Sequence, residues 1–175
     1  TAKHLLVTLG GADPHNVTTY VIEALQPLVA LDIRMTVVIG GSNPHEDAIR
    51  TAAKSSRVPI NICHNVNNMA QLMSNCDIAV SAGGSTCWEL AFMGIPPVII
   101  VLAKNQESPS SVLHQREVAI NLGRYEELTP NLIQEKTALL FQSQTTYQHM
   151  AELGQDLVDG FGANRIIKKK RSIYG

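Results

Sequence analysis

Apolar residues along the chain fall into short continuous runs that alternate with longer segments of helical spacing. The runs, rich in valine and isoleucine, predict buried strands at residues 4–9, 34–39, 60–63, 77–81 and 97–102. The helical spacing predicts helices at residues 17–31, 45–55, 69–74, 86–93 and 110–122, and two more near residues 131–141 and 146–158. Strands that alternate with helices in this way predict an α/β fold, a doubly wound parallel sheet with helices on both faces.

Length and composition fit one globular domain, which we expect to span residues 1–175. The chain has 175 residues, is 45% hydrophobic and has a formal net charge of −1, so it can bury a core and has no charge excess that favours nucleic acid. Without a bilayer-length apolar run or a signal-peptide pattern, we expect no membrane insertion. The basic run at residues 168–171 is interpreted as a solvated end. Because a strand begins so close to Thr1, we expect a piece of a longer protein.

Cysteines and histidines give no sign of a metal site. Cys63, Cys76 and Cys87 are odd in number and lack metal-ligand spacing, which indicates reduced thiols of a cytoplasmic protein. The six histidines also lack the spacing of known metal motifs. The sequence therefore predicts no bound metal.

The loops after the predicted strands are the candidate site, because ligands of a doubly wound sheet bind beyond the carboxyl ends of its strands. Polar or glycine-rich segments follow every predicted strand, at residues 10–16, 40–45, 64–69, 82–85 and 103–108. Turn and helix-cap chemistry alone accounts for Asp13 and Asn43, each of which precedes a proline.

The most informative loop follows the fourth strand, where Gly83, Gly84 and Ser85 stand between a strand and the start of a helix. Glycines at such a turn let backbone N–H groups approach an oxyanion, and the helix dipole favours negative charge. Glu89 lies about one turn into the helix, where its carboxylate could accept hydrogen bonds from a ribose diol. The pattern indicates a nucleotide-diphosphate site, although each feature also occurs for structural reasons alone.

A second polar loop, residues 104–108, follows the fifth strand directly. Successive side chains with strong hydrogen-bonding capacity suit the recognition of phosphate or sugar hydroxyls. The alternative is that Asn105 and Gln106 only cap the helix expected from Ser110.

Familiar catalytic motifs are absent. Neither early glycine-rich turn has the G-x-G-x-x-G pattern, no phosphate-binding Gly-Lys-Ser/Thr occurs, and Ser85 does not lie in a G-x-S-x-G elbow. His15, His45 and His64 lie on the candidate edge, and we interpret each as a loop or cap residue rather than a catalytic base. No catalytic residue is assigned.

Four segments in order resemble one family: LGGADPHN (residues 9–16), NVNNMAQLM (65–73), AGGSTCWE (82–89) and AKNQ (103–106). They are similar to the UDP-sugar hydrolases of pseudaminic acid biosynthesis and their spore-coat polysaccharide relatives. More distantly, the chain resembles the C-terminal half of the UDP-N-acetylglucosamine transferase of peptidoglycan synthesis. The resemblance covers about residues 4–167. It implies the GT-B architecture, two Rossmann-like domains across a cleft, of which this chain would be the C-terminal, nucleotide-binding half and the N-terminal domain its partner.

The resemblance also implies residue roles, with UDP or a UDP-sugar as the ligand and no cofactor. The residues facing the diphosphate would be Gly10, Gly11, Gly84, Ser85 and Thr86. The backbone around Val66 and Met69 would contact the uracil, and Glu89 would hold the ribose hydroxyls. Asn105 and Gln106 would contact the phosphate or the sugar.

The hydrolases that the chain resembles use water, without metal, to release UDP from an amino-deoxy sugar, and their proposed histidine base lies in the N-terminal domain. The resemblance therefore implies that this chain binds the nucleotide sugar but is inactive alone. Two alternatives stay open: the equivalent half of a glycosyltransferase, which would pass the sugar to an acceptor, and a binding module without catalysis. The closeness of the Asn-Gln-Glu and Gly-Ser-Thr-Cys-Trp-Glu motifs favours the hydrolase.

Overall fold

Six parallel strands form the sheet of the chain, whose computed structural model describes residues 2–161. The strands are β1 (His4–Thr8), β2 (Arg34–Ile39), β3 (Ile60–His64), β4 (Ile78–Ala82), β5 (Pro97–Val101) and β6 (Ile120–Arg124). Their spatial order is β3-β2-β1-β4-β5-β6, and every neighbouring pair is parallel. Because the order reverses between β1 and β4, the sheet is doubly wound.

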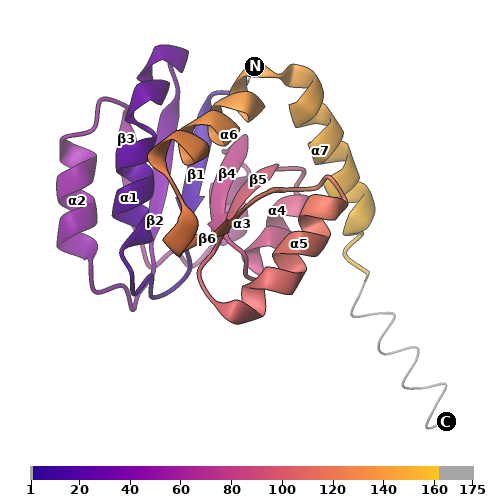
Figure 1. The fold of residues 1–175 in the computed structure, drawn as a ribbon, viewed down its shortest axis with the longest axis horizontal. Coiled ribbons are helices and arrows are strands. Elements are labelled where there is room, and N and C mark those ends of the chain that lie inside the picture. The colour runs from indigo at the N-terminus through magenta and orange to yellow at the C-terminus, as the bar shows by residue number, and fades with distance from the viewer. Residues whose placement is uncertain (1, 162–175) are drawn as a thin grey trace, which may run out of the picture.

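Helices connect the strands and cover both faces of the sheet (Figure 1). They are α1 (Val17–Ala24), η1 (Gln26–Leu31), α2 (Glu46–Lys54), α3 (Met69–Met73), α4 (Thr86–Phe92), η2 (Lys104–Gln106), α5 (Glu107–Gln115), η3 (Tyr125–Glu127), α6 (Pro130–Gln142) and α7 (Gln144–Leu157). Apolar residues of α1, η1 and α6 pack on one face of the sheet, and those of α3, α4 and α5 pack on the other. This division follows from right-handed crossovers that leave the middle of the sheet in opposite directions.

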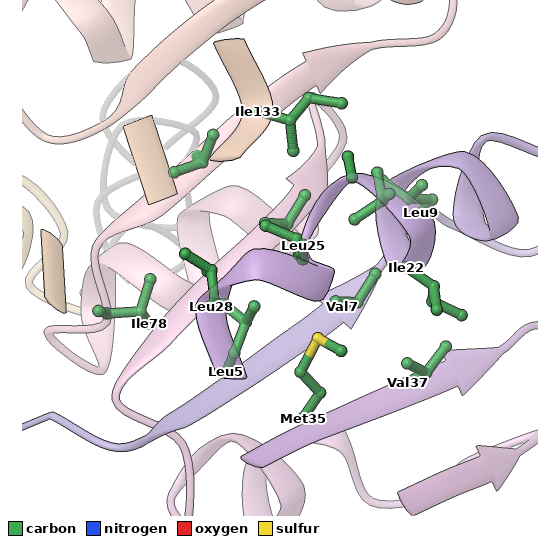
Figure 2. Close-up of a cluster of buried hydrophobic side chains, with 14 of the residues drawn as sticks. Leu5, Val7, Leu9, Ile22, Leu25, Leu28, Met35, Val37, Ile78 and Ile133 are labelled. Atoms are coloured by element: carbon green, nitrogen blue, oxygen red, sulfur yellow. The ribbon is translucent and has the colours of Figure 1, made fainter. Parts of the chain in front are cut away.

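Strand β1 shows how both faces are buried. Leu5 and Val7 point into the larger core, beneath η1 and beside Leu25 (Figure 2). Leu6 points to the opposite face, where it packs in a cluster with Met73 of α3 and Leu90 of α4. A strand that is buried on both faces must be apolar at successive positions, which explains the unbroken apolar runs in the sequence.

The predicted fold class is confirmed, and so are the five predicted strands, each within one residue at either end. Of the seven predicted helices, five occur with boundary shifts of up to two residues, and the other two, at residues 17–31 and 110–122, need correction. The helix predicted at residues 17–31 is interrupted, because Pro27 has no N–H to donate to a continuing α-helix. The chain forms α1 as far as Ala24 and then the 3₁₀-helix η1 from Gln26 to Leu31.

The prediction of a helix at residues 110–122 is wrong in its second half. Helix α5 starts earlier, at Glu107, and ends at Gln115, after which Glu117 adopts the left-handed backbone conformation with φ 57°. The N–H groups of Val118 and Ala119 both return to the carbonyl oxygen of Leu113, which closes the helix end. The chain then forms β6, a sixth strand that pairs with β5. Short apolar runs fit helical and strand spacing alike, so periodicity alone could not separate the two.

Two further predictions concern the basic run near the C-terminus and membrane insertion. The basic run at residues 168–171 lies outside the described residues. Among residues 2–161, no helix has both the length and the hydrophobicity that crossing a membrane requires.

Candidate functional site

Loops at the carboxyl ends of the strands form two groups, one on each side of the reversal between β1 and β4. In the first group, the loops after β1, β2 and β3 touch. A Cβ on Gly40 would overlap the carbonyl oxygen of Gly11, and the N–H of Ser42 donates to that same oxygen over 3.1 Å. A Cβ on Gly41 would lie 3.2 Å from Oδ1 of Asn65. The three loops therefore form one continuous surface.

The second group joins the loop after β4 to the start of α5. A Cβ on Gly83 would overlap the hydroxyl of Ser110 and would lie 3.1 Å from Cβ of Gln106. Ser110 is fully buried, and its hydroxyl has no hydrogen-bond partner among the described residues. Only glycine at position 83 lets the glycine-rich loop approach α5 this closely.

Gly84, Ser85 and Thr86 form the start of α4. A Cβ on Gly84 would meet no atom within 4 Å, so this glycine, unlike Gly83, borders open space. Within residues 2–161 the N–H groups of Ser85 and Thr86 have no hydrogen-bond partner, and the Ser85 side chain does not cap the helix. Unpaired donors at a helix start, together with the helix dipole, favour an anion.

The start of α1 is different, because the protein itself supplies the anion there. The carboxylate of Asp13, which is only 2% exposed, accepts hydrogen bonds from the N–H of Val17 over 2.8 Å and of Thr18 over 2.9 Å. This confirms the interpretation of Asp13 as a cap residue. Gly10 and Gly11 precede this cap at the surface, and a Cβ on either would meet no atom within 4 Å.

Val66 and Met69 lie on the first group of loops, at the start of α3. Both are partly buried against the core cluster that contains Leu6 and Met73, which anchors the loop to the sheet. Asn68 caps α3, since its Oδ1 accepts from the N–H of Gln71 over 3.0 Å. The loop is thus held by packing and by its own cap.

Glu89 is an exposed residue of α4, and its carboxylate makes no hydrogen bond or ion pair within the described chain. It lines a hollow of about 570 Å³ with the side chains of Trp88 and Phe92. Val66 lines a different hollow, of about 450 Å³, beside β2 and β3. The residues predicted for the ribose and for the uracil therefore line separate hollows.

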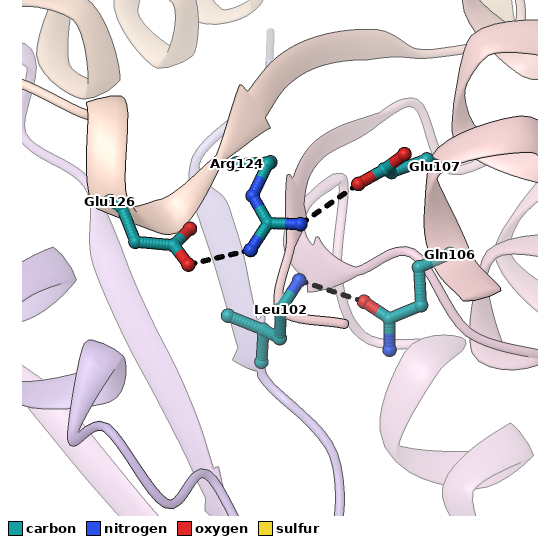
Figure 3. A network of polar contacts seen from close by, with 5 residues as sticks. All are labelled: Leu102, Gln106, Glu107, Arg124 and Glu126. Atoms are coloured by element: carbon teal, nitrogen blue, oxygen red, sulfur yellow. Dashed lines mark hydrogen bonds and ion pairs between the residues drawn. The ribbon is translucent and has the colours of Figure 1, made fainter. Parts of the chain in front are cut away.

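Asn105 and Gln106 lie in η2, between β5 and α5. Oε1 of Gln106 accepts a hydrogen bond from the N–H of Leu102 over 2.9 Å (Figure 3). Because a backbone N–H can only donate, this bond fixes the amide orientation and leaves Nε2 as an outward donor. The side chain of Asn105 is exposed and unpaired among the described residues, and neither side chain caps α5.

Arg124, at the end of β6, was missed because residues 120–122 of its strand were predicted as helix and residues 123–124 were assigned to no element. Its guanidinium donates to Glu107 over 2.8 Å and to Glu126 over 2.6 Å (Figure 3). These two carboxylates raise the pKa of Arg124 above its ordinary value. Gly123 could have indicated the strand from the sequence, since a glycine inside an apolar run argues against a helix. In the structure its φ is +85°.

Each histidine of this edge has a partner that explains its position. The ring of His15 stacks on that of Tyr125, with centroids 4.4 Å apart. Nε2 of His45 lies 3.1 Å from the carbonyl oxygen of Pro14, and Nε2 of His64 lies 3.4 Å from a carboxylate oxygen of Glu46. Asn43 caps the turn before α2, because its Oδ1 accepts from the N–H of His45 over 2.8 Å, as expected.

The thiol nearest the glycine-rich loop is that of Cys87, which lies in α4 and is 1% exposed. Burial raises its pKa to about 11, and its Sγ lies 3.1 Å from the carbonyl oxygen of Ala82. The thiol stays protonated at neutral pH, which excludes it as a thiolate nucleophile. No cluster of three or more His, Cys, Asp and Glu that could hold a metal ion occurs in residues 2–161.

Comparison with known families and proteins gives a consistent result. The family model "Glycosyltransferase family 28 C-terminal domain" matches residues 4–164. The chain is 25% identical over 173 residues to the spore coat polysaccharide biosynthesis protein SpsG of Bacillus subtilis, covering 98% of this chain and 51% of SpsG. The chain thus spans about half the length of this relative.

Solved structures agree on the fold. The crystal structure of Acinetobacter baumannii MurG matches with a TM-score of 0.82 at 15% identity, over 98% of this chain and 50% of MurG. A UDP-GlcNAc 2-epimerase from Neisseria meningitidis, bound to UDP-GlcNAc, matches with a TM-score of 0.70 at 19% identity, over 98% of this chain and 44% of the epimerase. At these identities the likeness concerns the fold alone.

These comparisons confirm the predicted similarity to the spore-coat polysaccharide relatives and a GT-B fold like that of MurG. They give no support to a hydrolase of pseudaminic acid biosynthesis, and they favour the glycosyltransferase alternative. The motifs that suggested a hydrolase lie directly after β4 and β5, at the carboxyl edge of the sheet.

Proposed function

Because the chain belongs to the family of glycosyltransferase family 28 C-terminal domains, we propose that it is the half of a GT-B glycosyltransferase that binds the nucleotide-sugar donor. The observation that carries the proposal is the start of α4. The N–H groups of Ser85 and Thr86, which have no partner among residues 2–161, lie there beside the point where the strand order reverses. That point is the ligand-binding position of doubly wound sheets.

The diphosphate would bind at this helix start. Gly84 has open space at its Cβ position, so a phosphate oxygen can approach the backbone closely. Gly10 and Gly11 would face the same group from the loop after β1, while Asp13 occupies the start of α1. We therefore assign the phosphates to α4 rather than to α1.

The nucleoside would lie toward α3, with Val66 and Met69 contacting the uracil through the backbone. Glu89 lines a different hollow from Val66, so the ribose would have to bridge the two hollows. The exposed carboxylate of Glu89 could then accept two hydrogen bonds from the ribose hydroxyls. Asn105 and Gln106 would contact the sugar or the phosphate next to it. Nε2 of Gln106 would donate, because its Oε1 is already bonded to Leu102.

The reaction would transfer the sugar to an acceptor hydroxyl, whose oxygen bonds to the anomeric carbon while UDP leaves. The described chain offers no histidine or carboxylate that a partner group orients as a base at the start of α4. We propose that the base and the acceptor surface belong to another part of a longer protein, since relatives are about twice as long. We propose a role in polysaccharide biosynthesis, which the similarity to SpsG supports.

Isothermal titration calorimetry with UDP and with uridine tests the binding proposal. We expect UDP to bind and uridine to bind far more weakly, because uridine lacks the diphosphate. Glu89→Ala should weaken UDP binding by about 1–3 kcal/mol, the cost of losing hydrogen bonds to a charged group. It should weaken 2′-deoxy-UDP less, because that analogue offers only one hydroxyl to the carboxylate.

Glu135→Ala, which changes an exposed carboxylate on α6, is the matched control and should leave UDP affinity unchanged. Absence of heat with UDP at millimolar concentration would contradict the proposal. Equal losses for UDP and 2′-deoxy-UDP in Glu89→Ala would remove Glu89 from the ribose site.

A further inference from the structure

The side-chain network around Arg124 joins three elements at the carboxyl edge of the sheet. Arg124 ends β6, Glu107 is the first residue of α5, and Glu126 lies in η3 (Figure 3). Nη1 donates to Glu107 over 2.8 Å, and Nη2 donates to Glu126 over 2.6 Å. The planar guanidinium is thereby held on both sides, an arrangement that a lysine cannot reproduce.

The contact between Arg124 and Glu107 is adjacent to the candidate sugar-binding residues, Asn105 and Gln106. Gln106 precedes Glu107 directly, and its Oε1 accepts from the N–H of Leu102 at the end of β5. The Cβ and the carbonyl oxygen of Gln106 also border Gly83, as Ser110 does. A shift at Glu107 would therefore move both the Gln106 amide and the wall of the glycine-rich loop.

The charges explain why Arg124 itself should not be a phosphate ligand. Its two terminal nitrogens are each bonded to a carboxylate, and its network combines one positive with two negative groups. An approaching phosphate would meet the negative charge of both carboxylates. The network is therefore better suited to holding the loop than to binding the diphosphate.

We propose that Arg124 is a positioning residue that acts through Glu107 to hold the Asn105–Gln106 turn toward the sugar of the donor. This inference rests on the proposed function for its ligand. Its structural part, that Arg124 fixes the bond between Gln106 and Leu102, stands on geometry alone. Arg124 then determines discrimination between a UDP-sugar and UDP, rather than affinity for UDP.

The test compares Arg124→Ala, Arg124→Lys, Glu107→Gln and the Arg124→Ala/Glu107→Gln double variant. Arg50→Ala is the matched control, because Arg50 is a similarly exposed arginine in an ion pair with Glu46, on α2. Hydrogen exchange of the Leu102 amide is measured without ligand, and affinities are measured for UDP and for UDP-N-acetylglucosamine. The melting temperature of each variant separates loss of fold from loss of position.

We expect Arg124→Ala to speed exchange at Leu102 by about threefold or more, as local opening becomes easier. Affinity for UDP-N-acetylglucosamine should fall about three- to fivefold, the factor that a partly exposed ion pair provides, while affinity for UDP changes less than about twofold. Glu107→Gln and the double variant should match Arg124→Ala, and Arg124→Lys should lie between it and wild type. Arg50→Ala should change neither quantity.

Unchanged exchange at Leu102 in Arg124→Ala would overturn the proposal, and so would equal losses for the two ligands. Additive losses in the double variant would show that Arg124 does not act through Glu107. If neither ligand bound the wild-type chain, the proposed function would fail, while exchange at Leu102 would still decide whether Arg124 positions Gln106.

Discussion

Gly83 and Gly84 are neighbours in the sequence, yet their surroundings require glycine for different reasons. Gly83 is in contact with Ser110 and Gln106 of the next connection, whereas Gly84 faces open space. The first glycine serves packing, and the second is free to serve a ligand.

This difference can be tested with single methyl groups. Gly83→Ala should cost about 1–3 kcal/mol of folding free energy, because the new methyl group overlaps a buried side chain. Gly84→Ala should change stability by less than about 0.5 kcal/mol but weaken UDP binding, because the methyl group occupies the approach to the backbone. Chemical denaturation and calorimetry measure the two effects.

Ser110→Gly supplies the control, since it removes the hydroxyl that the methyl group would meet. The double variant Gly83→Ala/Ser110→Gly should recover part of the lost stability. A Gly84→Ala chain that binds UDP like wild type would argue against a phosphate at this position.

At the scale of elements, the sequence predicted five strands, including the half-buried edge strand β3, and failed at the sixth. Residues 97–101 are all apolar, and the four after Pro97 are 0–2% exposed, so the sequence alone predicts β5. Strand β6 is an edge strand whose residues are all half-buried, and Asn121 and Gly123 interrupt its apolar pattern. The other edge strand, β3, has no glycine between Ile60 and His64, so its apolar pattern is not interrupted in this way.

Gly123 makes the sixth strand testable. Its φ of +85° places it in a backbone region that other residues enter at a cost, and its N–H donates to Oδ1 of Asn121 over 3.0 Å. Gly123→Ala should therefore destabilise the fold by about 1–2 kcal/mol. Gly11→Ala, where neither a left-handed backbone nor a close neighbour is present, should leave stability near wild type. Equal stability of the two variants in urea would contradict this account of β6.

His4 links the amino ends of two strands and gives the sheet a pH dependence. Nδ1 contacts the carbonyl oxygen of Asn75, which can only accept, so Nδ1 carries the proton of the neutral ring. Nε2 then accepts from the hydroxyl of Thr36 over 2.8 Å. Burial lowers the pKa of His4 below its ordinary value of 6.5, more than the contact with Asn75 raises it.

Because the folded-state pKa of His4 is lowered, the unfolded chain binds the proton more readily than the folded chain. The contribution to stability is therefore complete above pH 6.5 and is lost as the pH falls below it, toward the folded-state pKa. His4→Gln should flatten the fall in unfolding free energy between about pH 7.5 and 5.5 relative to wild type. Parallel curves for the two proteins would exclude His4 as the source.

At the scale of the whole molecule, the sequence predicted the edge of the sheet on which the candidate site lies, but not which loops of that edge contact one another. All predicted site residues lie at the carboxyl ends of strands or in the first turns that follow, as the doubly wound fold requires. Sequence order could not tell that the loop after β2 rests on the loop after β1, or that α5 rests on Gly83. Those contacts depend on the lateral order of strands, which the sequence alone does not specify.

The grouping of loops also bears on what the chain can do by itself. The unpaired donors of α4 favour a bound anion, but the three histidines of the same edge are placed by a ring stack, a carbonyl group and a carboxylate. We therefore expect the 175-residue chain to bind UDP-sugar without turnover, and a protein that includes the additional half present in its relatives to transfer the sugar. Turnover of the chain alone should be at least about 100-fold lower, the contribution of a missing general base.

Release of UDP from UDP-N-acetylglucosamine, followed with and without the other half, measures this difference. In the longer protein, Glu89→Ala should slow release at low donor concentration, since it weakens donor binding. If the chain alone turned over as fast as the longer protein, the base would have to lie within it, and His15 and His64 would be the residues to replace first.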